Sequence, residues 1–174
     1  MKKTLVDLFE SSVRQYPNNT FLLEKVGKAF QPTTYTQVKE QVYRLGAGLQ
    51  ALGVKKGDTM ALLSEGRNMW VIGELAMFYA GAVNVPLSIK LEESNDLLFR
   101  LIHGDVKYIM VSGTQLKKVR LIKDQLPAVE KIIILDAQES YEEGEMFVED
   151  VMKLGDVFLA NHTHEEFMAV ANSI

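Results

Sequence analysis

Cysteine is absent from this 174-residue chain, which excludes disulfide bonds and thiolate metal sites and fits a reducing compartment. Histidine is scarce, and His162 and His164 stand two positions apart, so on a helix they would point away from each other. We therefore expect no zinc site there. Positive charge is also in short supply, because 19 Lys and Arg face 23 Asp and Glu, for a net charge of −4. Nucleic-acid-binding proteins usually carry a basic surplus, so we expect no nucleic-acid partner.

Long apolar runs are missing as well. The longest, residues 69–83, contains Glu74 and is shorter than the ~20 residues that a membrane-spanning helix needs. Two lysines open the chain as in a signal peptide, but Asp7 and Glu10 interrupt any apolar segment behind them. We therefore expect a cytoplasmic protein with no transmembrane segment. The apolar fraction of 47% is ordinary for a soluble domain with its own core.

Short apolar runs alternate with helical patterns along the middle of the chain. Four runs have the length and composition of buried parallel strands: 59–64, 82–87, 107–111 and 131–135. Helical patterns stand between them, at 69–81, 92–103 and 115–126. Such alternation indicates βαβ units. The predicted fold class is therefore α/β, a mostly parallel sheet with helices on both faces.

An N-terminal unit precedes this core. Residues 4–16 have an amphipathic helical pattern, and residues 21–33 have the pattern of a β-hairpin. The next helix, at 35–52, has the strongest periodicity in the chain. Thr34 and Gln37 have the spacing of a capping box at its start.

The last part of the chain has a different composition. Residues 138–145 carry four glutamates, which is typical of a solvated loop. Two surface helices are expected after it, at 147–154 and 165–171, the second with a capping box made by Thr163 and Glu166. We expect one N-terminal subdomain with three parts: the helix and hairpin at 1–33, the βαβ core at 34–136, and the acidic loop with two surface helices at 137–174.

Residues 46–51 (GAGLQA) match a dinucleotide-binding fingerprint. That fingerprint works where its glycines leave a strand, because the backbone can then approach a pyrophosphate. Here the glycines lie inside the helical pattern at 35–52. We therefore interpret them as positions of close helix packing.

Residues 111–115 stand where the third strand gives way to a helix, at the carboxyl end of the sheet. Free backbone N–H groups and the helix dipole make this place a candidate anion site, and Lys117, Lys118 and Arg120 follow it. The alternative is that Thr114 caps the helix and that the basic side chains are solvated. A single glycine is a weak phosphate signal, which favours the alternative.

Polar and aromatic residues also follow the first strand, at the same edge of the sheet: Glu65, Arg67 and Trp70. An exposed arginine and tryptophan there could contact a ligand, or they could hold the loop and fill the core. The sequence leaves both interpretations of Arg67 and Trp70 open. Asn68 is placed to cap the helix at 69–81.

Four ordered segments resemble the adenylate-forming enzymes, the acyl-CoA synthetases and their relatives among AMP-binding proteins. These segments are 34–38 (TYTQV), 45–58 (LGAGLQALGVKKGD), 64–72 (SEGRNMWVI) and 81–87 (GAVNVPL). Within the family, the chain is most similar to the long-chain fatty acid–CoA ligases. The family usually has Asn-Arg-Pro-Glu-Trp where this chain has GRNMW, so the proline and the acidic residue are missing.

The resemblance implies a parent enzyme that is an ATP-dependent acid–thiol ligase acting on a fatty acid, with Mg²⁺ and CoA as further requirements. The family's phosphate-binding loop, its later adenylate motif and its carboxyl-terminal lysine have no counterpart here. The resemblance therefore implies that this chain is an inactive amino-terminal scaffold fragment with no catalytic residue, no metal and no bound cofactor. Basic residues near the helix at 115 can approach CoA in relatives, which makes Lys117 and Lys118 weak CoA candidates. Arg67 and Trp70 are weak crevice candidates.

The resemblance also bears on partners and location. The parent would act in the cytoplasm or at a membrane surface. The family packs this sheet, through helices, against a second sheet, so apolar helix surface, for instance at 69–81, should be exposed or covered by a second copy. The alternative is a stand-alone doubly wound binding or interaction module without catalysis. A receiver-like module needs an acidic cluster at a strand end, and the expected strand ends lack one: Ser64, Leu87 or Ser88, Ser112 and Asp136.

Overall fold

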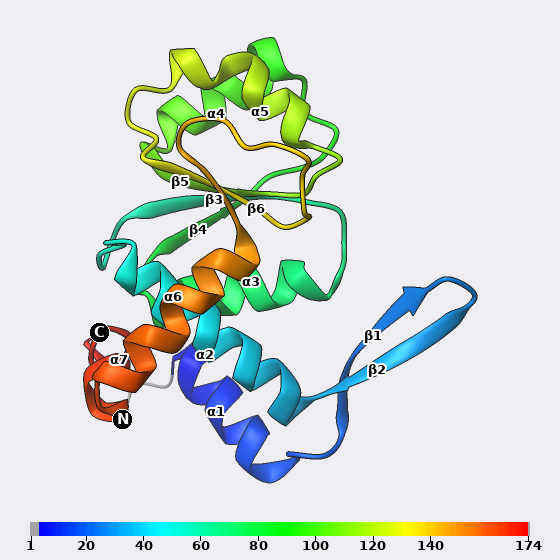
Figure 1. The fold of residues 1–174 in the computed structure, drawn as a ribbon, viewed down its shortest axis with the longest axis vertical. Helices are drawn as coiled ribbons and strands as arrows, with labels where there is room; N and C mark the ends of the chain where they lie inside the picture. The colour runs from blue at the N-terminus through cyan, green and yellow to red at the C-terminus, as the bar shows by residue number, and fades with distance from the viewer. Residues whose placement is uncertain (1–3, 174) are drawn as a thin grey trace.

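Five strands form one parallel sheet at the centre of the molecule (Figure 1). The structure is a computed structural model that describes residues 4–173, without the side chains of residues 93 and 94. The strands are β3 (Thr59–Leu63), β4 (Val83–Pro86), β5 (Val106–Val111), β6 (Lys131–Ile134) and β7 (Glu145–Phe147). Their order across the sheet is β4-β3-β5-β6-β7, and every neighbouring pair is parallel. The predicted α/β fold class is confirmed.

Helices cover both faces of this sheet (Figure 1). One face carries α1 (Leu5–Gln15), α2 (Tyr35–Ala51), α3 (Asn68–Tyr79), α6 (Val148–Asn161) and α7 (His164–Asn172). The other carries the π-helix η1 (Glu93–Leu97), α4 (Leu98–His103), α5 (Leu116–Ile122) and the 3-10 turn η2 (Lys123–Gln125). No helix among the described residues has both the length and the apolar character needed to cross a membrane.

The core has two halves because successive strand residues point to opposite faces of the sheet. In β3, Met60 and Leu62 face the larger helix layer, whereas Ala61 and Leu63 face η1, α4 and α5. All four side chains are buried. Burial on both faces explains why the strands have nearly continuous apolar sequences.

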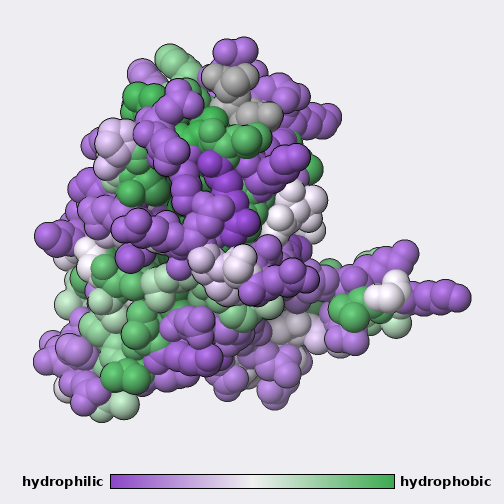
Figure 2. Space-filling model, turned by 45° about the horizontal axis from the view of Figure 1, so that its top comes forward, coloured by the Kyte–Doolittle hydropathy of each residue, from purple (hydrophilic) through white to green (hydrophobic). Residues whose placement is uncertain are grey.

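A β-hairpin projects from this body, made of β1 (Thr20–Val26) and β2 (Ala29–Thr34) (Figures 1 and 2). Several of its apolar side chains are exposed: Leu23, Val26 and Phe30. The predicted hairpin and the predicted capping box of Thr34 and Gln37 are both confirmed.

The C-terminal part differs from the prediction in two ways. The acidic loop ends one residue earlier than expected, because Glu145, the last residue of the predicted loop, is buried and begins β7. Helix α6 exposes its outer face, as expected of a surface helix, but its inner face packs more closely on α2 than the sequence indicated. A Cβ atom on Gly155 would lie 1.8 Å from the carbonyl oxygen of Arg44, and one on Gly48 would lie 2.1 Å from that of Val151. Glycine at both positions lets the two backbones touch, which confirms that Gly48 serves helix packing.

Candidate functional site

The strand order creates one switch point in the sheet, between β3 and β5. From β3 the chain goes to β4 on one side and then crosses to β5 on the other side. In open α/β sheets, ligands bind outside the carboxyl ends of the strands at such a point. We call the polar residues that follow β3, β5 and β6 the switch-point crevice: Glu65, Arg67, Ser112, Gly113, Gln115 and Asp136.

An ion pair ties these strand ends together. Arg67 donates from Nη1 to both carboxylate oxygens of Asp136, at 2.8 and 2.9 Å. The backbone N–H of Gly113 donates to the same carboxylate at 2.7 Å. One side chain after β6 therefore fixes the loops that follow β3 and β5. These contacts favour the interpretation of Arg67 as a residue that holds the loop.

The candidate anion site at 111–115 already contains an anion, the carboxylate of Asp136. Its bond to Gly113 uses a donor that a phosphate would need. The cap expected from Thr114 is wrong, because residues 112–115 form a turn in which the N–H of Gln115 donates to the carbonyl of Ser112 at 3.1 Å. Helix α5 starts only after Gln115, and no side chain caps it.

A second polar pair lies deeper at the switch point. Gln115 donates from Nε2 to Oε1 of Glu65 at 2.5 Å. Burial raises the pKa of Glu65, whereas hydrogen bonds lower it, and the bond from Gln115 has the largest lowering effect. The hydrogen bonds outweigh burial, so the pKa of Glu65 lies below its usual value. The Oγ of Ser112 and the Oε1 of Gln115 have no hydrogen-bond partner within the described part of the chain, although both residues are buried. Unpaired buried polar atoms are rare in native proteins, so these two atoms stand out at the switch point.

The lysines of α5 are placed differently from one another. Lys118 donates to the carbonyls of Ile89 and Leu91, at 2.6 and 3.1 Å, and so anchors the loop that follows β4. Lys117 is exposed and makes no hydrogen bond or ion pair within residues 4–173. Lys117 is therefore the better placed of the two for a phosphate group, because Lys118 would have to release the loop first.

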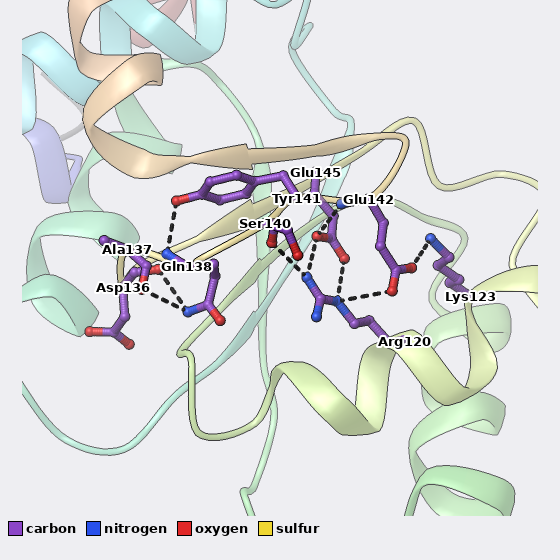
Figure 3. Close-up of polar contacts among 9 residues, drawn as sticks. All are labelled: Arg120, Lys123, Asp136, Ala137, Gln138, Ser140, Tyr141, Glu142 and Glu145. Carbon is purple, nitrogen blue, oxygen red and sulfur yellow. Dashed lines mark hydrogen bonds and ion pairs between the residues drawn. The ribbon is translucent and has the colours of Figure 1, made fainter.

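Two further cations, Arg120 of α5 and Lys123 of η2, bind the acidic segment (Figure 3). Arg120 pairs with both carboxylate oxygens of Glu145, at 2.8 and 2.7 Å, and Lys123 pairs with Glu142 at 2.5 Å. The side chain of Glu145 is fully buried, and the guanidinium of Arg120 holds its pKa below the usual value against the effect of burial. Arg120 and Lys123 are thus neutralised within the protein, whereas Lys117 and Lys118 of α5 pair with no carboxylate among the described residues.

The start of α3 is held by the hairpin. The residue expected to cap it, Asn68, is the first residue of the helix, and Arg67 takes the cap position without a side-chain bond. The carboxylate of Glu24 in β1 instead accepts from the N–H of Asn68 at 3.1 Å. The prediction for Asn68 is therefore wrong, because a residue 44 positions away supplies the bond. Trp70, in the first turn of α3, is half-buried and packs against the core.

The crevice offers few free ligands for a metal ion. Among the described residues, no three His, Asp or Glu side chains lie close enough together to hold a metal ion. Of the two carboxylates present, Asp136 is bound by Arg67 and Glu65 by Gln115. We therefore assign no chemical step to these residues.

The family relationship is visible across nearly the whole chain. A model of the family described as AMP-binding enzyme matches residues 9–167. The chain belongs to the AMP-binding enzyme family. This agrees with the resemblance carried by the four sequence segments.

Similar curated proteins are much longer than this chain. A substituted-propanoyl:CoA ligase of Mycobacterium tuberculosis is 35% identical over 56% of this chain and 19% of the ligase. Long chain acyl-CoA synthetase 1 of Arabidopsis thaliana is 28% identical over 66% of this chain and 18% of the synthetase. The chain thus spans about a fifth of the length of either relative.

Solved structures share the fold. An anthranilate CoA ligase in complex with anthranoyl-AMP superposes with a TM-score of 0.74 and 24% identity, over 85% of this chain and 27% of the ligase. A long-chain-fatty-acid-CoA ligase from Archaeoglobus fulgidus gives a TM-score of 0.77 and 16% identity, over 89% of this chain and 30% of the ligase. At such identities the likeness establishes the fold alone.

Proposed function

We propose that this chain is an amino-terminal scaffold part of an ATP-dependent acyl-CoA synthetase that acts on long-chain fatty acids. In the complete enzyme, the fatty-acid carboxylate attacks ATP and releases pyrophosphate, and the thiol of CoA then displaces AMP from the acyl-adenylate. ATP, Mg²⁺ and CoA belong to the complete enzyme, in the cytoplasm or at a membrane surface. Membership of the AMP-binding enzyme family supports the reaction class. The long-chain substrate is supported by the names of relatives alone.

One observation supports a scaffold role for this part more than any other. The crevice at the switch point is occupied by the protein's own ion pair, Arg67 with Asp136, and the nearby N–H of Gly113 is bonded to the same carboxylate. A nucleotide phosphate would have to displace that carboxylate from both donors. The residues that surround it therefore stabilise the loops and leave the chemistry to other parts of the enzyme.

A pyrophosphate-release assay tests the proposal. The purified chain is mixed with palmitate, ATP, Mg²⁺ and CoA, with a complete acyl-CoA ligase as the positive control. We expect release no faster than in a protein-free blank. A rate above the blank that persists after a further purification step would contradict the scaffold role.

The second candidate is a stand-alone binding module, and the unpaired polar atoms of Ser112 and Gln115 favour it. A thermal-shift screen with small polar metabolites separates the two functions. A binding module would gain stability with one ligand, and Gln115→Leu would remove that gain. A scaffold would show no shift with any ligand.

A further inference from the structure

One carboxylate joins α1 to α2 and α3, the helices against which it packs. Oε1 of Glu10 accepts from the hydroxyls of Tyr43 in α2 and Tyr79 in α3, both at 2.5 Å. Its other oxygen, Oε2, accepts from Nζ of Lys39 at 3.1 Å. The Glu10 side chain is only 13% exposed, and hydrogen bonds to a charged group are the strong ones. We call Glu10 and these three partners the α1 clasp.

Apart from the clasp, α1 is attached along one narrow stripe. Its buried side chains are Val6, Phe9 and Val13. Space lies on both sides of that stripe, with a hollow of about 590 Å³ between α1 and α7 and one of about 240 Å³ between α1 and α3. An element with few buried contacts can open at a lower free energy than global unfolding requires. The clasp therefore contributes a large share of what holds α1 in place.

The segment that follows α1 is fixed to the start of α2 (Figure 1). Both the N–H and the hydroxyl of Thr36 donate to the carbonyl of Pro17, at 3.1 and 2.9 Å. The N–H of Tyr35 donates to the carbonyl of Asn19 at 3.1 Å. Tyr16, at the end of α1, lies just before this fixed segment and is 43% exposed. Rotation at Tyr16 would move α1 as a unit and leave the hairpin in place.

We propose that α1 is a hinged cover, which opens about Tyr16 while the sheet and the other helices stay folded, and that the α1 clasp sets how often it opens. In the closed state, Phe9 packs edge-on against the ring of Tyr79, with 6.5 Å between the ring centroids. Opening exposes both tyrosine hydroxyls and the aromatic cluster behind them, in which Phe167 of α7 packs on Tyr43 and Tyr79. The cover thus controls solvent access to this end of the core.

The absence of cysteine from the chain allows a direct test, because one introduced thiol reports the exposure of one site. Val13→Cys places the thiol on the buried face of α1, and Val111→Cys places it in the buried strand β5. With a thiol-reactive probe and no denaturant, we expect Val13→Cys to react at least about tenfold faster than Val111→Cys. Equal rates would overturn the proposal, because both sites would then be exposed only by global unfolding.

Two further substitutions separate the opening of α1 from unfolding of the whole chain. Glu10→Gln should speed the reaction at position 13 by at least about tenfold, because it removes the charge of the clasp. Its control, Glu40→Gln at an exposed site on α2, should leave that rate unchanged. Ile122→Val, in the core on the opposite face of the sheet, should speed the reaction at position 111 by about two- to tenfold and leave position 13 unchanged. Equal acceleration of both positions by Ile122→Val, or none by Glu10→Gln, would contradict a separately hinged α1.

Hydrogen exchange of the natural chain repeats the comparison without any substitution. After correction for intrinsic rates, the amides of α1 should exchange at least about tenfold faster than those of β5. Low concentrations of urea should change the α1 rates little, because opening of one helix exposes little surface. Exchange of α1 at the rate of β5, with the same dependence on urea, would overturn the proposal.

Discussion

At the scale of single residues, glycine decides whether α2 and α6 can meet. A Cβ atom on Gly155 would lie 1.8 Å from the carbonyl oxygen of Arg44, which belongs to helical backbone and cannot move away cheaply. We expect Gly155→Ala to lower the free energy of unfolding by about 3 kcal/mol or more, because the helices must separate and lose packing. Urea unfolding measures the change.

Gly66→Ala is the matched control for that substitution. No atom lies within 4 Å of a Cβ built on Gly66. We expect its free energy of unfolding to stay within about 0.5 kcal/mol of the natural chain. Equal stability of the Gly155 and Gly66 variants would contradict the close approach of the two helices.

The buried carboxylate of Glu145 depends on one cation. Arg120→Met leaves that charge without its bidentate partner, since the Glu145 side chain is fully buried. We expect a loss of about 3 kcal/mol in the free energy of unfolding. Lys153→Met is the control, because its pair with Asp150 is largely exposed and should contribute little.

The same pair makes stability depend on pH. Arg120 holds the pKa of Glu145 below its usual value of 4.5. The stabilisation is therefore complete above pH 4.5 and is lost as the pH falls through the lower pKa of the folded state. Urea midpoints measured from neutral to acidic pH should fall in this window for the natural chain and fall less steeply for Arg120→Met. Identical slopes would show that the ion pair has no such role.

At the scale of elements, two hydrogen bonds join the hairpin to the start of α3, one to the carboxylate of Glu24 and one from Asn68 Nδ2 to the hydroxyl of Thr33. Glu24 accepts from the N–H of Asn68, which would otherwise be an unpaired donor at the helix start. We expect Glu24→Ala to cost about 1 kcal/mol and to speed hydrogen exchange of the Asn68 amide. Exposed Lys25 offers the control, since Lys25→Ala should leave that exchange rate unchanged. An unaltered rate in the Glu24 variant would contradict the capping role.

Elements that depend on local sequence could be predicted, and those that depend on tertiary contacts could not. Both predicted capping boxes are present, because their residues are only three positions apart. The four expected strands are present because burial on both faces demands apolar runs. Strand β7 was missed because it has only three residues and begins with Glu145, whose burial depends on distant Arg120. The close packing of α6 on α2 depends on Gly48 and Gly155, which are more than 100 positions apart. The hydrophobic periodicity of the sequence does not reveal that these two glycines meet.

At the switch-point crevice, too, local sequence predicted one part and tertiary contacts decided the other. Its location followed from strand ends, so Arg67 and the loop at 111–115 were found from sequence. The contacts within the crevice could not be predicted from the strand ends, because the Arg67–Asp136 ion pair joins residues that are 69 positions apart in the sequence. No motif marks Gln115 or Glu65 as a pair. Composition alone indicated neither the ion pair nor the two unpaired polar atoms.

At the scale of the whole molecule, the described residues form a parallel sheet that is covered by helices on both faces. Its apolar strands pack helices on both faces, so the fold is supported by its own core. Its polar groups at the switch point mostly bind one another. This combination is expected of a scaffold in a larger enzyme rather than of a catalytic centre.

Titration calorimetry with Mg²⁺–ATP tests that central claim most directly. The natural chain is titrated to about 1 mM nucleotide, with Arg67→Met in parallel to open the ion pair over the crevice. We predict no saturable heat for the natural chain, since Asp136 occupies the donors that a phosphate would use. Saturable binding in the micromolar range by the natural chain would contradict the account.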